Sequence, residues 1–128
     1  MFTPTNVLTG KIIGAAIEVH RTLGAGLLES AYHQCLAREL QLQGIHYKFD
    51  WPLPLEYKGI RVKKGYRMDL LVEDSVIVEV KSIEALAPIH EAQLLTYMRL
   101  RKVRLGLLIN FNEIVLKNGI RRKILDFE

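Results

Sequence analysis

The stretch DLLVEDSVIVEVK, residues 69–81, decides the fold. Two apolar runs, residues 70–72 and 76–78, flank the polar triplet Glu73-Asp74-Ser75, and this pattern predicts a β-hairpin. The residues of both runs are bulky and apolar on either face, which is typical of strands inside a sheet. We therefore expect a pair of central strands.

Three charged residues interrupt this apolar hairpin: Asp69, Glu79 and Lys81. Alternate strand residues share a face, so Glu79 and Lys81 point the same way, and Asp69 joins them if it lies opposite Glu79. A loop over residues 73–75 produces that register, whereas a two-residue loop would place Asp69 opposite Val80. In the first register the other face carries an apolar set: Met68, Leu70, Val72, Val76, Val78 and Val80.

The charged face has two interpretations. A charge buried in an apolar sheet costs several kcal/mol unless it has a partner or a metal. Two carboxylates that hold a divalent ion, with a lysine beside the attacking water, form the layout of a metal-dependent phosphodiesterase. Alternatively, Lys81 forms a structural ion pair with Glu79 or Asp69. The central position of the strands favours the first interpretation.

Periodicity and turn signals predict the remaining elements. The expected helices cover residues 6–23, 27–43 and 88–102. Asn6 is expected to cap the first, Gly44 to end the second in a left-handed conformation, and Pro88 to begin the third. The expected strands cover residues 46–50, 53–57, 60–73, 75–82 and 104–110, and residues 113–117 and 120–125 form a final hairpin around Lys117-Asn118-Gly119. Pro52 and Pro54 indicate an edge, and Lys58-Gly59 indicates a turn. This order predicts one α/β domain over residues 1–128, a mixed β-sheet flanked by α-helices.

Two helices carry polar pairs at helical spacing. Gln93 and Tyr97 are four residues apart and share a face, so both are able to reach a substrate phosphate or Lys81. Glu29 and Tyr32 follow a glycine break at a helix start. A polar helix face, or a first-turn glutamate favoured by the helix dipole, explains each pair without a function.

Composition narrows the class of protein. The 128 residues are 49% hydrophobic with a net charge of +4, which is ordinary for a globular protein and mildly favours an anionic partner. The single cysteine, Cys35, reads as a small buried hydrophobe and suits a reducing cytoplasm, and we expect neither a membrane span nor a signal peptide. Other chemistries have little support in the sequence. It has no Gly-x-Ser-x-Gly elbow and no phosphate-binding loop, and its histidines do not have the spacing of zinc ligands.

Four of these motifs together resemble a known family. Gly26-Leu-Leu-Glu29-Ser-Ala-Tyr32 is similar to the motif of the GxxExxY proteins. Asp69, Glu79-Val-Lys81 and Gln93-Leu-Leu-Thr-Tyr97 are similar to the Asp, (D/E)xK and QxxxY motifs of the PD-(D/E)xK nuclease superfamily. Met68 and Ala25 stand where prolines are usual, and neither change removes a ligand.

The resemblance implies a restriction-endonuclease-like fold and a nuclease that uses Mg²⁺ or Mn²⁺. Nucleic acid is the expected substrate, with DNA favoured over RNA and the choice between them left open. It implies metal ligation by Asp69, Glu79, the Val80 carbonyl and Glu29, with Tyr32 bracing Glu29. Lys81 would orient the attacking water, and Gln93 and Tyr97 would position the phosphate. A nucleic-acid-binding or regulatory protein without turnover is the alternative, and a protein-interaction module is a weaker one. The oligomeric state stays open.

A basic run precedes Asp69 and consists of Lys58, Arg61, Lys63, Lys64 and Arg67. Such a run contacts nucleic-acid phosphates in one interpretation. In the other, its lysines protect a sheet edge from pairing with another chain.

Overall fold

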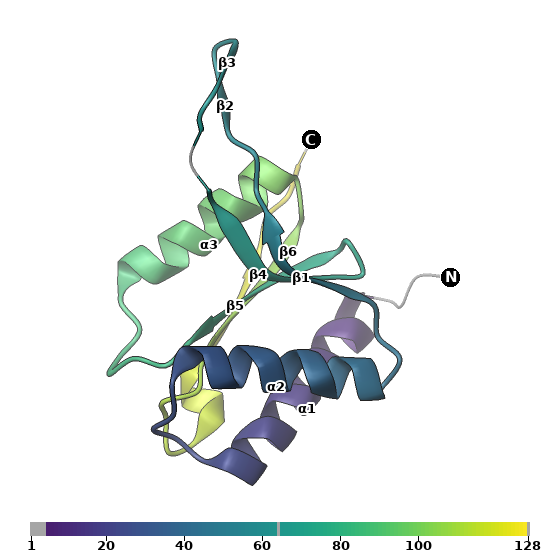
Figure 1. Ribbon diagram of the computed structural model, residues 1–128, viewed down its shortest axis with the longest axis vertical. Coiled ribbons are helices and arrows are strands. Elements are labelled where there is room, and N and C mark those ends of the chain that lie inside the picture. Colours follow the sequence, from purple (N-terminus) through teal and green to yellow (C-terminus); the bar gives the residue numbers. More distant parts are fainter. Residues whose placement is uncertain (1–4, 64, 128) are drawn as a thin grey trace.

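Helices pack on both faces of a mixed β-sheet in the computed structural model, which describes residues 5–63 and 65–127 (Figure 1). The helices are α1 (Thr5–Leu23), α2 (Glu29–Leu42), α3 (Pro88–Arg101) and the short 3₁₀ helix η1 (Leu116–Gly119). The strands are β1 (Tyr47–Pro52), β2 (Glu56–Tyr57), β3 (Ile60–Arg61), β4 (Arg67–Val72), β5 (Val76–Lys81), β6 (Leu105–Asn110) and β7 (Ile120–Ile124). Within these residues, no helix is long and apolar enough to cross a bilayer.

The main sheet has the strand order β1-β4-β5-β6-β7. Neighbouring strands are antiparallel except β5 and β6, which are parallel and are joined through α3. A parallel pair needs such a crossover, because a tight turn can only reverse the chain. The predicted mixed sheet, the central hairpin and the edge position of the proline-containing strand are confirmed.

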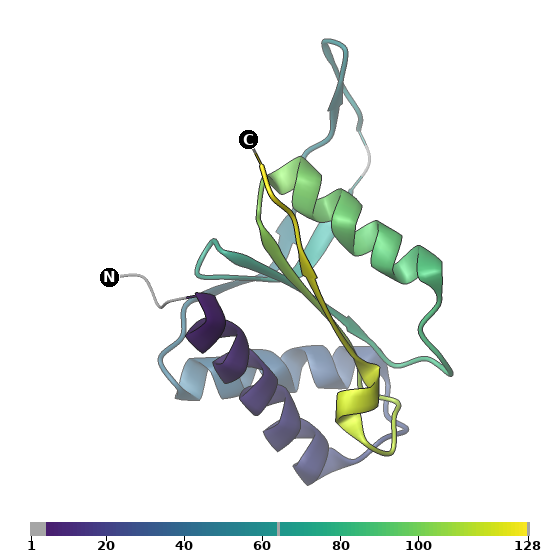
Figure 2. The same ribbon diagram turned by 180° about the vertical axis from the view of Figure 1, so that it is seen from behind.

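Helices α1 and α2 lie on one face of this sheet and α3 lies on the other (Figures 1 and 2), with an apolar cluster on each face. On one face, α1 and α2 pack against Leu70 and Val72 of β4 and against Val76, Val78 and Val80 of β5. On the other face, Leu94 and Met98 of α3 pack against Leu71, Ile77 and Leu108. The central strands are therefore buried on both sides, as their continuous apolar sequence predicts.

The hairpin register agrees with the three-residue loop. Leu70, Leu71 and Val72 pair with Val78, Ile77 and Val76, so the next position brings Asp69 opposite Glu79. One predicted position is wrong: Met68 packs with the α3 cluster, whereas Leu70 packs with the α1–α2 cluster. The switch occurs beside Asp50 of β1, which has a left-handed φ of 49°. Asp50 is the one position in the β1–β4 ladder whose pairing is missing, although Phe49–Leu70 and Trp51–Met68 keep the same register on either side of it.

Several expected boundaries differ from the structure. The strand expected over residues 60–73 is split, because β2 and β3 form a separate two-stranded ribbon that projects from the body (Figure 1). Only Glu56–Tyr57 of the strand expected over residues 53–57 is formed. The first helix already includes Thr5, so Asn6 lies inside it, and the second begins at Glu29. Lys58, Gly59 and Gly44 have positive φ angles of 44°, 88° and 72°, as the turn and the helix end require.

The final hairpin is also a wrong prediction. Residues 116–119 form η1 instead of the end of a strand, and β7 pairs with β6. Gly119 is buried so closely against β6 that a Cβ atom there would overlap the backbone carbonyl oxygen of Asn110. This tertiary contact overrides the hairpin preference of Asn118-Gly119.

Candidate active site

Asp69 and Glu79 form a pair of carboxylates at the point where the β4–β5 ladder ends. The Asp69 N–H donates to Glu79 Oε2 at 2.8 Å, and the Val80 N–H donates to Asp69 Oδ2 at 2.8 Å. Each side chain thus binds the backbone of the opposite strand beyond the last regular pair, Leu70–Val78. Glu79 is only 6% exposed and Asp69 is half-buried, so the two carboxylates are fixed in place.

Burial raises the pKa of both acids, and a neighbouring carboxylate adds to the rise, Asp69 in the case of Glu79 and Asp50 in the case of Asp69. The pKa of Glu79 rises to about 8, first because of burial and then because of the Asp69 charge, and the Asp69 N–H opposes the change only in part. Burial also raises the pKa of Asp69. The Val80 N–H and the positive charges of His33 and Lys81 lower it, but only in part. A cation near the pair would favour the ionised form of both groups.

One oxygen of each carboxylate is available to such a cation. Among the described residues, Asp69 Oδ1 and Glu79 Oε1 accept no hydrogen bond, and neither is sealed from solvent. Oxygen donors of this kind suit Mg²⁺ or Mn²⁺, and Mg²⁺ is often held by only one or two carboxylates. The carboxylate pair therefore fits a divalent ion, although residues 5–63 and 65–127 contain no cluster of three acidic, histidine or cysteine ligands.

Lys81 is the last residue of β5 and is half-buried. Its carbonyl accepts the Phe111 N–H at 2.9 Å, which fixes the strand end. Its ammonium lowers the pKa of both Asp69 and Glu79 but forms no ion pair with either, nor with any other acid that the structure describes. The alternative of a structural ion pair is therefore not what the structure contains.

Gln93 and Tyr97 share a face of α3, as predicted. The Gln93 amide donates to the Tyr97 hydroxyl at 3.2 Å, so it is directed at Tyr97 and not at Lys81. Tyr97 is 8% exposed. Burial raises its pKa, the hydrogen bond from Gln93 lowers it, and the charge of Glu79 raises it further. The phenol is therefore close enough to the carboxylate pair to sense its charge.

Tyr32 was predicted to brace Glu29. In the structure its hydroxyl bonds the backbone of the loop that precedes Glu29. Its hydroxyl donates to the Gly24 carbonyl at 2.5 Å and accepts the Leu27 N–H at 3.1 Å. Its ring is fully buried and stacks on Phe111, with ring centres 4.6 Å apart. Ser82, next to Lys81, donates its hydroxyl to the Leu27 carbonyl at 2.6 Å. The loop is thereby tied to the end of β5.

Glu29 begins α2 and is exposed. Its charge is the smallest of the contributions that raise the pKa of Glu79. The structure thus leaves Glu29 outside the carboxylate pair, and its role as a metal ligand stays a prediction. The same is true of the Val80 carbonyl.

Two polar residues at the site were not expected from the sequence. His33 donates from Nε2 to the Asp69 carbonyl at 2.7 Å, and its ring stacks on Phe49. Asn110 is fully buried and bonds both the N–H and the carbonyl of Ile83, at 3.0 and 3.1 Å. Two sequence signals point to these residues. His33 lies four residues after Glu29 on the same helix, and Asn110 is an amide at the end of an otherwise apolar strand.

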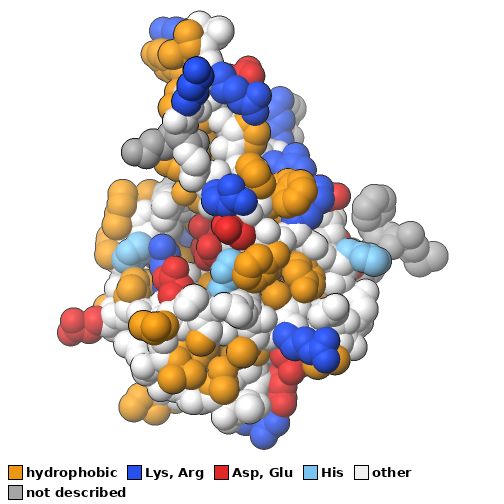
Figure 3. Space-filling model, viewed as in Figure 1, with side chains coloured by type: hydrophobic (Ala, Val, Ile, Leu, Met, Phe, Trp, Pro, Cys, Tyr) orange, Lys and Arg blue, Asp and Glu red, His pale blue; other side chains and the backbone are white. Residues whose placement is uncertain are grey.

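Figure 3 shows acidic side chains near the middle of one face, with lysines and arginines above them towards the ribbon. Of the basic run, Lys58, Arg61 and Lys63 are exposed on or beside the β2–β3 ribbon. Arg67 is engaged by Asp50, donating to its carboxylate at 2.9 Å and its carbonyl at 2.5 Å. Lys64 lies outside the described residues.

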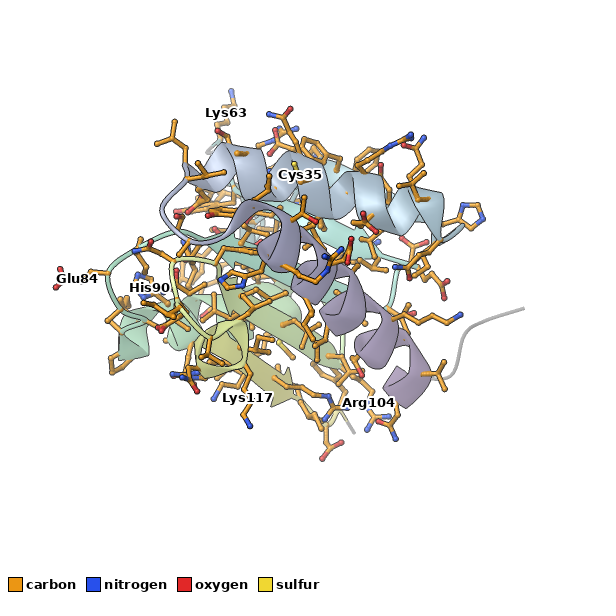
Figure 4. The ribbon with its side chains drawn as sticks, turned by 90° about the horizontal axis from the view of Figure 1, so that it is seen from below. Cys35, Lys63, Glu84, His90, Arg104 and Lys117 are labelled. Atoms are coloured by element: carbon orange, nitrogen blue, oxygen red, sulfur yellow. The ribbon has the colours of Figure 1, made fainter. Side chains whose placement is uncertain are left out.

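Figure 4 labels three further side chains of chemical interest: Cys35, His90 and Glu84. Cys35 is half-buried beside the α1–α2 cluster, which agrees with its prediction as a small hydrophobe. His90 accepts the Ala87 N–H at 2.8 Å and so caps α3. Glu84, in the segment after Lys81, points away from the body of the protein.

Comparison with known proteins provides one match. A family model for the PD-(D/E)XK nuclease superfamily matches residues 6–123, which is most of the chain. Comparisons with curated proteins and with solved structures found no significant match.

Proposed function

Since the chain belongs to the PD-(D/E)XK nuclease superfamily and has its restriction-endonuclease-like fold, we propose that it is a metal-dependent nuclease that hydrolyses phosphodiester bonds, in DNA rather than RNA. The observation that carries the proposal is the carboxylate pair of Asp69 and Glu79, with the ammonium of Lys81 beside Glu79 on β5 and paired with no acid among the described residues. The motif around Glu29 and Tyr32 further suggests the GxxExxY branch of the superfamily.

Asp69 and Glu79 would hold Mg²⁺ or Mn²⁺ through their open oxygens, with the Val80 carbonyl and Glu29 as further ligands. When bound, the ion would polarise the scissile phosphate and generate a nucleophilic water. Glu29 would join through its position at the start of α2, which the Tyr32 clamp and the Ser82 bond hold beside the end of β5. Asp69 is held in turn by His33.

Lys81 would orient the attacking water and stabilise the negative charge that develops on the phosphate. An ammonium that is not neutralised by a neighbouring carboxylate has its charge available for this purpose. Tyr97 and Gln93 would position the phosphate from α3. Lys58, Arg61, Lys63 and Lys64 would contact the backbone of the nucleic acid, and Arg67 would do so once released from Asp50.

Nucleic-acid binding without turnover is the second candidate. The exposed position of Glu29, outside any three-ligand cluster of the described residues, favours it. The single free cysteine and the charge of +4 fit a cytoplasmic protein that acts on nucleic acid under either proposal.

The test is cleavage of single-stranded and duplex DNA and RNA with Mg²⁺, Mn²⁺ or EDTA. Lys81→Ala should abolish cleavage while retaining the fold and nucleic-acid binding, because its role lies in the transition state. Lys117→Ala, an exposed lysine on η1, is the matched control and should cleave like wild type.

Calorimetry with Mn²⁺ separates the two candidates. Binding that is lost in Asp69→Ala supports the site, and binding of metal and nucleic acid without any cleavage supports the second candidate. Cleavage that persists in EDTA, or full activity of Lys81→Ala, contradicts the proposed nuclease.

A further inference from the structure

A groove of about 750 Å³ runs between the edge strand β1 and the C-terminal end of α3. Residues 49–54 form one wall, and Leu100, Arg101 and Lys102 form the other. Its volume lies in the range of ~300–1,000 Å³ that is typical of ligand-binding pockets. None of the residues assigned to catalysis lines it.

The groove is basic. Arg67, Arg101 and Lys102 line it against one carboxylate, Asp50. The ammonium of Lys48 lies 5.2 Å from the centre of the Trp51 ring, and Asp74 pairs with Lys48 at 2.9 Å and with Arg101 at 3.8 Å. Four cations thus stand against the two carboxylates Asp50 and Asp74, so this surface keeps a net positive charge. The lining therefore favours an anionic chain over a neutral peptide.

Aromatic rings are exposed in the same groove. Trp51 is 43% exposed and Phe49 is 41% exposed. A basic groove with exposed aromatic rings is the arrangement that binds single-stranded nucleic acid, where bases stack on the rings and cations follow the backbone. In a duplex the bases stack on one another and present no free face to Trp51.

A chain of contacts links the groove to the carboxylate pair. The Phe49 ring stacks on His33 with ring centres 4.0 Å apart, and His33 bonds the Asp69 carbonyl. The groove residue Phe49 is thus one side chain, His33, away from Asp69.

A second copy of the chain fits this surface less well. Two copies of the groove would bring the same positive charges together. The edge of β1 is also interrupted, by the left-handed Asp50 and by Pro52, which has no N–H to donate.

We propose that this groove binds a single-stranded stretch of nucleic acid, with Trp51 stacked on a base and Arg101 and Lys102 against phosphates. The inference rests on the proposed function for the identity of the ligand. It adds that the enzyme holds an unpaired strand next to its site.

Trp51 is the only tryptophan of the chain, so its fluorescence reports on the groove directly. In EDTA, twelve-residue oligothymidylate and oligouridylate should quench the Trp51 emission, and a DNA duplex of equal length should not at the same concentration. The two oligonucleotides distinguish DNA from RNA. Equal quenching by duplex and single strand, or none by either, would overturn the proposal.

Fluorescence anisotropy of a labelled oligothymidylate measures the contribution of the ring. Trp51→Ala should weaken binding by about 5- to 100-fold, and Trp51→Phe should restore most of it. Ile114→Ala, which removes an apolar side chain that is 90% exposed and does not line the groove, is the control and should bind like wild type. Wild-type affinity of Trp51→Ala would refute the groove. A Trp51 emission that follows protein concentration instead would indicate a second copy and would also refute it.

These outcomes are independent of cleavage. Single-strand quenching without Mg²⁺-dependent cleavage leaves the groove standing and removes the nuclease. Mg²⁺-dependent cleavage without quenching of Trp51 supports the nuclease and removes the groove as a binding site.

Discussion

Glu79 is buried beside Asp69, and this placement should make the stability of the metal-free protein depend on pH. The pKa of Glu79 is about 8 in the folded state, against an ordinary value of 4.5. Between these values the folded protein keeps a proton that the unfolded chain has released, so the free energy of unfolding falls as pH rises. One proton is worth about 1.4 kcal/mol per pH unit.

Urea unfolding in EDTA at pH 6 and pH 8 tests this expectation. Between pH 6 and pH 8 the free energy of unfolding should fall by as much as about 2 kcal/mol more in wild type than in Glu79→Gln. The reason is that glutamine does not ionise and still accepts the Asp69 N–H. Addition of Mg²⁺ at pH 8 should recover part of the loss in wild type only. Parallel behaviour of the two proteins would show that Glu79 is already ionised at pH 6.

Single residues also show what sequence reasoning can and cannot reach. Asp69, Glu79 and Lys81 were predictable as one group, because charge within an apolar hairpin needs a reason and strand alternation places the three on one face. His33 was not, because it touches the site through a backbone carbonyl, and its neighbour Phe49 lies on another element. Contacts of this kind depend on how α2 crosses the sheet, which no local pattern specifies.

At the level of elements, local patterns predicted the segments whose residues are uniformly buried. They failed where a tertiary contact determines the local conformation. β6 is buried throughout and was predicted almost to its ends. Asn118-Gly119 is compatible with a hairpin turn and with a 3₁₀ turn, and the close approach of Gly119 to β6 selects the second. Likewise, Met68 lies on the α3 side, next to the irregular position at Asp50, although alternation in β4 alone places it with Leu70.

Gly119→Ala should therefore destabilise the protein by about 1–3 kcal/mol, since its Cβ would overlap the backbone of Asn110, which cannot shift without moving β6. Gly10→Ala is the matched control. Gly10 lies inside α1 with open space around it, so alanine there should stabilise by about 0.5–1 kcal/mol. Chemical denaturation measures both variants. Equal effects would show that η1 does not depend on close contact with β6.

On the scale of the whole molecule, positive charge is expected to guide the substrate along one side. Lys58→Ala/Lys63→Ala should weaken binding to all sequences alike and flatten the dependence of log affinity on log salt by about one to two units. Anisotropy titrations at several salt concentrations measure this slope.

Lys11→Ala/Lys117→Ala is the control with the same loss of charge. Figure 4 shows Lys63 and Lys117 on opposite sides of the molecule. If general attraction to the charge of +4 is responsible, the two double variants will show equal slopes, and the ribbon then has no special part in binding.

The crossed hydrogen bonds between Asp69 and Glu79 have a consequence for spectroscopy. The backbone N–H groups of Asp69 and Val80 each end on a carboxylate of the pair, so their amide proton chemical shifts follow the charge on those carboxylates. The protein thus contains two intrinsic NMR probes, one on each central strand, that sense protonation or an approaching cation without any label at the reacting groups.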